Sequence, residues 1–128
     1  MTRPKPTLSV ELKALSATWK ALLKYPDGFC CGDAAYESRE VLGKGEILGY
    51  SSEENPTAVL GHDEGGHDFL LVDKGFILDF WAATYYDYKM QYDLRADAKQ
   101  ILKLYGPREN WKPSPVIGSV LHPVLSPR

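Results

Sequence analysis

Two apolar runs that lie close together in the chain restrict its fold more than any other feature. The runs are Phe69–Val72 and Phe76–Trp81, and only Asp73-Lys74-Gly75 separates them. Short apolar runs on either side of a glycine-containing turn predict a β-hairpin. Because consecutive residues in both runs are apolar, both faces of each strand need cover. The hairpin is therefore expected in the middle of a sheet.

Asp79 interrupts the second apolar run, between Leu78 and Phe80. A carboxylate in such surroundings costs several kcal/mol unless it is paired, so Asp79 needs a partner. We expect that partner to be His67, which stands just before the first run. An interaction with the backbone or with a tyrosine from residues 85–92 is the alternative.

The length of the loop decides whether these two side chains can meet. With a three-residue loop and Gly75 in the left-handed conformation, Val72 pairs with Phe76. Counting on from that pair makes His67 and Asp79 diagonal neighbours on one face of the sheet. A two-residue loop would shift the register by one residue and turn Asp79 to the opposite face.

The remaining periodicity predicts three helices and one further strand. These are a helix capped by Thr7 or Ser9 that runs to about Lys24, a helix from about Cys31 to Gly43, a strand at Glu46–Ser51, and a helix from Asp93 to Tyr105. We therefore expect a single α+β domain over residues 1–128, with N-terminal helices packed on a small antiparallel sheet. Residues 1–6 are expected to form a loose arm, and the proline-rich residues 111–128 a strap across the body.

Charge and composition exclude several classes of protein. With 15 basic and 17 acidic residues the net charge is −2, which does not favour a nucleic-acid surface. No apolar run approaches the ~18 residues that cross a bilayer, so no membrane partner is expected. The N-terminus lacks the apolar stretch of a secretory signal, which favours a cytoplasmic protein, or one exported by a signal-independent route. The oligomeric state is left open.

The two cysteines, Cys30 and Cys31, are adjacent, so they cannot cross-link distant parts of a fold. Cys31 is expected at the start of the second helix, where unpaired N–H groups and the helix dipole favour a thiolate. It faces the same side as Ala34 and Ala35, towards the sheet, whereas Cys30 points about 100° away. Cys31 is therefore the preferred nucleophile and Cys30 the alternative. Both cysteines could instead be small buried apolar residues.

Cys31, His67 and Asp79 together supply the parts of a thiol active site. A nucleophilic thiol needs a base within hydrogen-bond reach and a third group that orients the base. Beside this site, Gly66 would allow a substrate to approach closely, and Trp81 could line a substrate cleft. Packing in the core or at its rim is the alternative for Trp81.

The segment His62–Asp68 offers a competing metal site. It contains two histidines and three carboxylates within seven residues. The two histidines, His62 and His67, are five residues apart, which matches no common zinc spacing. We therefore predict no bound metal and no cofactor, and a solvated acidic loop in this segment.

The same residues carry a family resemblance. Cys31-Gly32-Asp33-Ala34-Ala35 resembles the Cys-x-Asp-x-Ala sequence that opens the core helix of transglutaminase-like proteins. His67–Val72 and Gly75–Phe80 look like the family's histidine strand, turn and aspartate strand. The resemblance extends over residues 28–86. It implies a papain-like or transglutaminase-like core with Cys31 as nucleophile, His67 as base and Asp79 as orienting group.

Two positions depart from the family's pattern. Phe80 follows the aspartate where the family often has proline, and residues 22–30 contain no glutamine for an oxyanion hole. An oxyanion hole would therefore rest on backbone N–H groups, such as that of Cys31.

The functional expectation is acyl transfer through a thioester. The outcome would be that of a protease, amidase, deamidase or transglutaminase acting on a protein or peptide, and by analogy the chain could be an effector or toxin. A binding or inhibitory module that kept the fold without the chemistry is the first alternative. A metal-binding regulatory domain that uses His62–Asp68 is the second.

Overall fold

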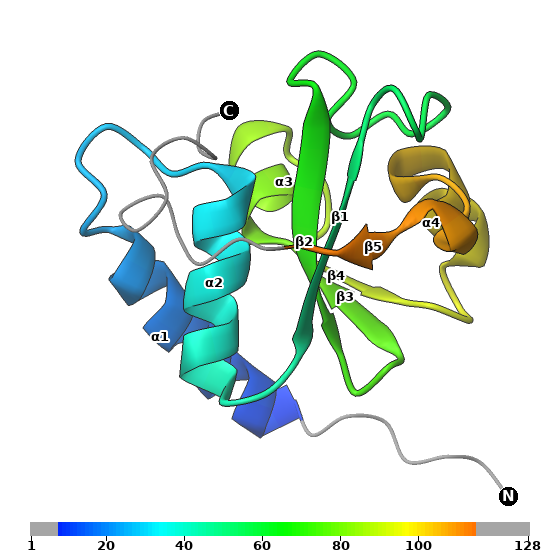
Figure 1. Ribbon diagram of the computed structural model, residues 1–128. Coiled ribbons are helices and arrows are strands. Elements are labelled where there is room, and N and C mark those ends of the chain that lie inside the picture. Colours follow the sequence, from blue (N-terminus) through cyan, green and yellow to red (C-terminus); the bar gives the residue numbers. More distant parts are fainter. Residues whose placement is uncertain (1–7, 115–128) are drawn as a thin grey trace, which may run out of the picture.

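The chain folds into helices packed around a small antiparallel sheet (Figure 1), so the predicted α+β class is confirmed. The computed structural model describes residues 8–114, with side chains from residue 15 onward. The predicted arm at residues 1–6 and the part of the predicted strap beyond residue 114 lie outside the described residues. The elements are α1 (Leu8–Leu22), α2 (Cys31–Leu42), β1 (Glu46–Ser51), β2 (Gly66–Val72), β3 (Phe76–Leu78), α3 (Phe80–Tyr85), β4 (Gln91–Asp93), α4 (Ala98–Tyr105), a 3₁₀ turn (Arg108–Asn110) and β5 (Lys112–Pro113).

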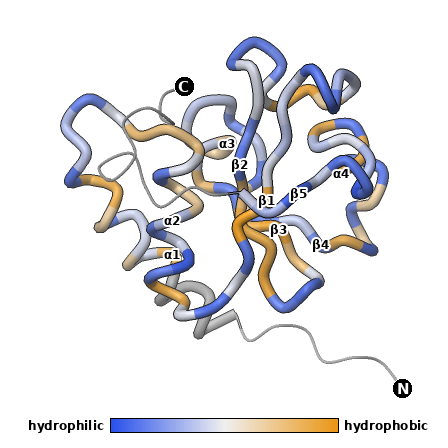
Figure 2. The backbone as a smooth tube through the Cα atoms, in the orientation of Figure 1, coloured by the Kyte–Doolittle hydropathy of each residue, from blue (hydrophilic) through white to orange (hydrophobic). Residues whose placement is uncertain are grey.

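The predicted hairpin forms the centre of the sheet. The strand order is β4-β3-β2-β1-β5, and every neighbouring pair is antiparallel. β2 is therefore the middle strand, and six of its seven residues are buried. Figure 2 shows the apolar segments gathered where β2 and β3 meet, while the outer turns are hydrophilic. This agrees with two strands that need cover on both faces.

The turn between β2 and β3 has the predicted length, and Val72 pairs with Phe76 as expected. The expected left-handed conformation of Gly75 is wrong. Asp73 and Lys74 take positive φ angles of 53° and 55° instead. The Gly75 N–H closes the turn on the Val72 carbonyl at 3.0 Å, so the two left-handed positions are the residues before the glycine, as in a type I′ turn.

The second strand is shorter than predicted. β3 ends at Leu78, and the apolar residues after Asp79 begin the short helix α3 instead of continuing the strand to Trp81. The Oδ1 atom of Asp79 accepts a hydrogen bond from the N–H of Ala82 at 2.9 Å, which caps this helix. Trp81 consequently lies in α3 and not in the sheet. The strand β3 ends here because Asp79 caps the helix that follows it.

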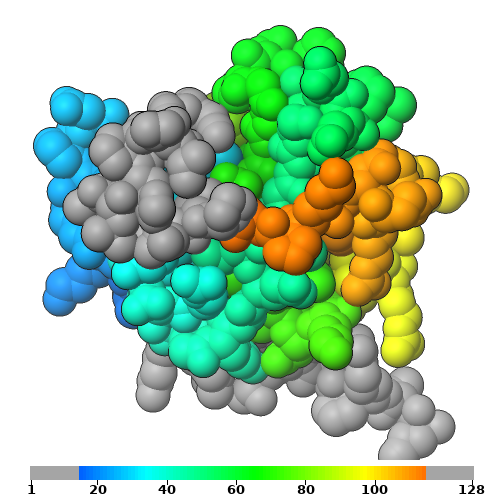
Figure 3. Space-filling model, in the orientation of Figure 1, coloured from blue at the N-terminus to red at the C-terminus, as the bar shows by residue number. Residues whose placement is uncertain are grey.

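The segment after α3 also differs from prediction. The helix expected from Asp93 begins only at Ala98, and Asp93 lies in the edge strand β4. The Asp93 side chain accepts hydrogen bonds from the N–H groups of Arg95 and Ala96, which turns the chain before α4 can begin. At the opposite edge of the sheet, β5 pairs with β1. Figure 3 shows this orange segment crossing the molecule between α2 and α4.

The helices cover the sheet from two sides. α1 packs on α2, and α2 packs on β2 and β1. α4 lies on the opposite side from α1 and α2 (Figure 1). The core between these layers includes five residues that are 0% exposed: Leu70, Ile77, Phe80, Tyr92 and Tyr105. No helix among the described residues is long and apolar enough to cross a membrane.

Candidate active site

His67 and Asp79 are paired in the interior of the protein. The Nε2 atom of His67 lies 2.7 Å from Oδ2 of Asp79, and the two side chains are 0% and 1% exposed. β2 supplies the histidine at its second residue, and the aspartate follows the last residue of β3, as the N-cap of α3. The three-residue turn between these strands therefore sets the register that brings the two side chains together, as predicted.

Asp79 has a further partner that the sequence did not indicate. The hydroxyl of Tyr105, the last residue of α4, donates to Oδ2 of Asp79 at 2.6 Å. With the Ala82 N–H on Oδ1, the carboxylate accepts hydrogen bonds on both oxygens. Burial by itself raises the pKa of Asp79, but the positive charge and hydrogen bond of His67, followed by the bonds from Tyr105 and Ala82, hold it below its usual range.

The pKa of His67 is shifted by the same two opposing effects, burial and the charge of its partner. Burial lowers the pKa of His67, but the charge and hydrogen bond of Asp79, with a smaller contribution from Cys31, raise it to about 10. The pair therefore holds as an imidazolium and a carboxylate across neutral pH. Rings surround the imidazole: Trp81 at 5.0 Å, Tyr105 at 5.8 Å, Phe69 at 6.1 Å and Tyr50 at 6.2 Å between centroids.

The second ring nitrogen of His67 is buried and makes no hydrogen bond within the described part of the chain. Since Asp79 occupies Nε2, this free nitrogen is Nδ1. Cys31 is close enough to contribute to the raised pKa of His67. The imidazole is thus fixed on one side by a carboxylate and has its other nitrogen available to a thiol.

Cys31 is the first residue of α2 and is 2% exposed. Its Sγ atom accepts a hydrogen bond from the backbone N–H of Asp68 at 3.3 Å, which ties the start of the helix to β2. The Oδ2 atom of Asp68 lies 4.0 Å from the same sulfur. Asp68, which the sequence placed only in the candidate metal segment, is therefore a direct neighbour of the thiol.

Cys30 lies just outside the helix, as its N-cap residue. Its N–H donates to Oδ2 of Asp33 at 3.0 Å. Burial and the nearby Asp33 carboxylate raise the pKa of Cys30 to about 12. This environment favours the neutral thiol at Cys30.

The two residues expected to meet a substrate have packing roles. Trp81 is buried between His67 and the rings of Tyr85 and Tyr86. A Cβ atom at Gly66 would lie 2.5 Å from the Tyr50 carbonyl oxygen, so the glycine lets β1 and β2 approach at this point. Trp81 thus forms a wall of the candidate site, and Gly66 positions the strand that carries His67.

The segment His62–Asp68 does not converge on a metal. His67 points to Asp79, whereas the His62 side chain is 66% exposed and its Nδ1 lies 3.3 Å from Oδ1 of Asp63. Over residues 8–114, no three histidine, cysteine or carboxylate side chains are arranged to hold a metal ion. The Tyr86 hydroxyl donates to Glu64, which fastens this segment to the end of α3.

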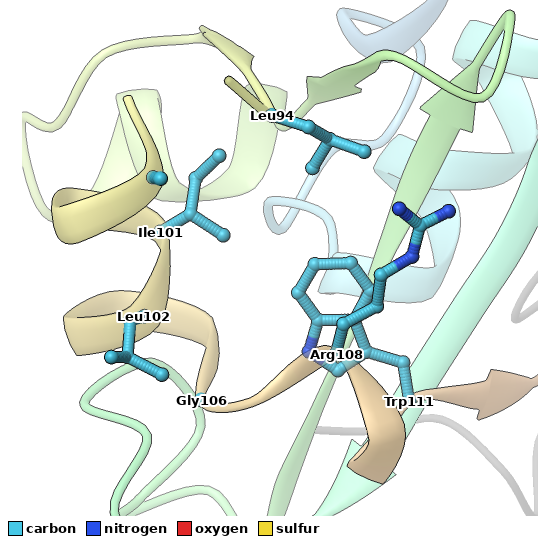
Figure 4. Close-up of a pocket in the computed structure, with 7 residues that line it drawn as sticks. Leu94, Ile101, Leu102, Gly106, Arg108 and Trp111 are labelled. Carbon is cyan, nitrogen blue, oxygen red and sulfur yellow. The ribbon is translucent and has the colours of Figure 1, made fainter. Parts of the chain in front are cut away.

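A hollow of about 270 Å³ lies elsewhere, between α4 and the segment that follows it (Figure 4). Ile101 and Leu102 line one side, and Trp111 and Arg108 line the other. None of the three predicted catalytic residues reaches it. It is a surface feature of the face that α4 covers and is separate from the candidate active site.

Comparisons of the chain with protein-family models, with curated proteins and with solved structures find no match.

Proposed function

We propose that the chain is a thiol-dependent acyl-transfer enzyme in which Cys31 is the nucleophile, His67 the base and Asp79 the group that orients the base. The observation that carries this proposal is the state of the His67 ring. One nitrogen is held by a buried carboxylate, and the other is buried, free of hydrogen bonds and next to a thiol. A histidine that served packing alone would not need a carboxylate that costs free energy to bury.

The chemistry follows from this arrangement. In the reactive pair His67 already holds the proton of the Cys31 thiol on Nδ1, and the Sγ thiolate attacks the carbonyl carbon of a carboxamide or peptide bond. A C–S bond forms and the C–N bond breaks, and the proton passes from Nδ1 to the departing amine. Water or a second amine then attacks the thioester, regenerates the thiol and gives hydrolysis or transamidation. Asp79 keeps the ring oriented and stabilises its positive charge throughout.

The surroundings of the two cysteines support Cys31 over Cys30. Cys31 is the first residue of α2, and it is the cysteine that contributes to the raised pKa of His67. Cys30 has a pKa raised to about 12 by burial and by Asp33, which makes it a poor thiolate. The backbone N–H groups at the start of α2 are the candidate donors for the oxyanion.

The arrangement also supports a papain-like or transglutaminase-like core. A helix that begins with the cysteine packs on β2, which carries the histidine, and the next strand leads to the aspartate. The proposed substrate is a carboxamide of a protein or peptide, as the resemblance implies.

A binding module of the same fold, without turnover, is the second candidate. Two observations favour it: Cys31 is only 2% exposed, and the Asp68 carboxylate lies 4.0 Å from its sulfur. A negative charge at that distance opposes formation of a thiolate.

Acylation by a small activated ester separates the two candidates. p-Nitrophenyl acetate is mixed with the protein, p-nitrophenol release is followed, and the site of acetylation is read by mass spectrometry. We expect a burst of one equivalent with the acetyl group on Cys31, lost in Cys31→Ser and retained in Cys30→Ser. No burst above the rate of a free thiol, with Cys31→Ser folded as the wild type is, would support the binding module.

A further inference from the structure

Tyr105 makes a contact at the candidate site that no sequence pattern predicted. Its hydroxyl reaches Oδ2 of Asp79, the same oxygen that pairs with His67. Both Tyr105 and Asp79 are buried, and the O···O distance of 2.6 Å is that of a strong, charge-assisted hydrogen bond. The carboxylate is thus held by a donor that lies outside the proposed proton-transfer path.

The backbone fixes the position of this hydroxyl. The carbonyl oxygen of Tyr105 accepts hydrogen bonds from Asn55 Nδ2 and from Trp111 Nε1, each at 2.8 Å. Asn55 is 0% exposed, and a Cβ atom at Gly106 would lie 2.2 Å from its Oδ1 atom, so the end of α4 is closely fitted to this amide. Two separate segments, those that carry Asn55 and Trp111, therefore hold the end of α4 in place.

The ring of Tyr105 is also closely packed. It contacts Phe69 at 4.9 Å and His67 at 5.8 Å between centroids. A hydroxyl on a ring held in this way has little freedom to leave Asp79. The Asp79 side chain in turn cannot rotate without breaking its bonds to Tyr105 and to the Ala82 N–H.

We propose that Tyr105 is a positioning residue, which keeps the Asp79 carboxylate charged and directed at His67. The inference rests on the proposed function for its catalytic consequence, while the interaction itself can be tested without any activity.

The sign of the effect follows from the groups that face Asp79. These are His67 from β2, Tyr50 from β1, Tyr92 from β4 and Tyr105 from α4. The pKa values of the three tyrosines are raised by burial and by the Asp79 charge, so these residues stay neutral between pH 4 and pH 10. Removing the Tyr105 hydroxyl withdraws one of the bonds that lower the pKa of Asp79, and that pKa must rise.

The chain offers a matched control in Tyr92. Like Tyr105 it is 0% exposed, and the two rings are in contact, 5.8 Å apart. Its hydroxyl is buried and has no hydrogen-bond partner within the described residues. Tyr92→Phe therefore removes a buried hydroxyl from the same part of the core without removing a bond to Asp79.

The test compares Tyr105→Phe, Tyr92→Phe and wild type in two measurements. The first is the ¹³C NMR titration of the Asp79 side-chain carboxyl. We expect its midpoint to rise by about one pH unit in Tyr105→Phe, as expected for the loss of one hydrogen bond to a charge, and to stay unchanged in Tyr92→Phe. Equal midpoints in all three proteins, or an equal shift in both variants, would overturn the inference.

The second measurement is the rate of Cys31 acylation by p-nitrophenyl acetate at pH 7. We expect about a tenfold lower maximal rate in Tyr105→Phe at unchanged half-saturating ester concentration, and a wild-type rate in Tyr92→Phe. A wild-type rate of acylation in Tyr105→Phe would contradict a positioning role for Tyr105. If wild type itself is not acylated, the proposed function fails while the carboxyl titration still decides whether Tyr105 holds the charge of Asp79. Thermal unfolding of each variant establishes that both proteins are folded.

Discussion

His67 Nε2 and Asp79 Oδ2 lie 2.7 Å apart in the core, at a point where neither side chain meets solvent. Removing one member of such a pair leaves the other charged and buried. This relationship therefore controls both the stability of the fold and the state of the candidate base.

Asp79→Asn is expected to destabilise the protein by about 3–5 kcal/mol, because it leaves an uncompensated charge on buried His67. Urea unfolding at pH 6 measures the change. Asp73→Asn is the control, since Asp73 pairs with Lys44 at an exposed site and its loss should cost less than about 1 kcal/mol. Equal losses in the two variants would mean that the buried pair contributes no more than a surface one.

The same pair predicts how stability depends on pH. The pKa of His67 is about 10 in the folded protein against 6.5 for the free side chain, so its contribution is complete below pH 6.5 and is lost as pH rises towards 10. The pKa of Asp79 is lowered from 3.8, so its contribution is present above pH 3.8 and is lost as pH falls through the lowered value. The pair stabilises the fold most between these limits.

Urea unfolding of wild type and His67→Gln at pH 5.5, 7.5 and 9.5 tests this dependence. The stability difference between the two proteins should shrink as pH rises above 6.5, because the unfolded wild-type chain loses the His67 proton there while the folded protein keeps it until about pH 10. A difference that grows with pH would show that folded His67 is neutral, contrary to its raised pKa.

Asp68→Asn is expected to make Cys31 more reactive. It removes a negative charge 4.0 Å from the sulfur, and a charge at that distance is worth about 1 kcal/mol even in water. Alkylation of Cys31 by iodoacetamide at pH 7 should therefore become at least about fivefold faster. Asp73→Asn, at the far end of β2, should leave the rate unchanged, and an unchanged rate in Asp68→Asn would mean that its carboxylate does not act on the thiol.

Gly75→Ala is expected to leave stability unchanged within about 0.5 kcal/mol, because Gly75 has no left-handed φ angle and its Cβ position is nearly open. Lys74→Gly should stabilise the protein by about 0.5–1 kcal/mol, since Lys74 carries a φ angle of 55°. Thermal unfolding of both variants measures this. If Gly75→Ala destabilised the protein and Lys74→Gly did not stabilise it, Gly75 would be the left-handed residue of the turn, as the sequence predicted.

The pairing of His67 with Asp79 could be predicted because it depends on local rules. A three-residue loop fixes the register of two adjacent strands, and a carboxylate among apolar residues needs a partner. The turn conformation and the end of β3 were missed because each depended on competition between local alternatives. Asp79 could extend a strand or cap a helix, and the bond to the Ala82 N–H decided it.

The contact of Tyr105 with Asp79 and that of Asp68 with Cys31 were missed for different reasons. Tyr105 is 26 residues from Asp79, and its place on the apolar face of a helix hid the polar role of its hydroxyl. The one available signal was that a buried tyrosine hydroxyl usually finds a partner. Asp68 approaches Cys31 largely through its backbone N–H, which no side-chain pattern encodes.

Selective alkylation of Cys31 tests the central claim most directly. Wild type, Cys30→Ser, Cys31→Ser and His67→Ala are treated with iodoacetamide from pH 5 to pH 10, and each cysteine is quantified by mass spectrometry. We predict labelling of Cys31 below pH 7 at a rate that falls in His67→Ala, with Cys30 unreactive until much higher pH. Equal and slow labelling of both cysteines, with the midpoint of a free thiol and no effect of His67→Ala in a folded protein, would contradict an activated thiol.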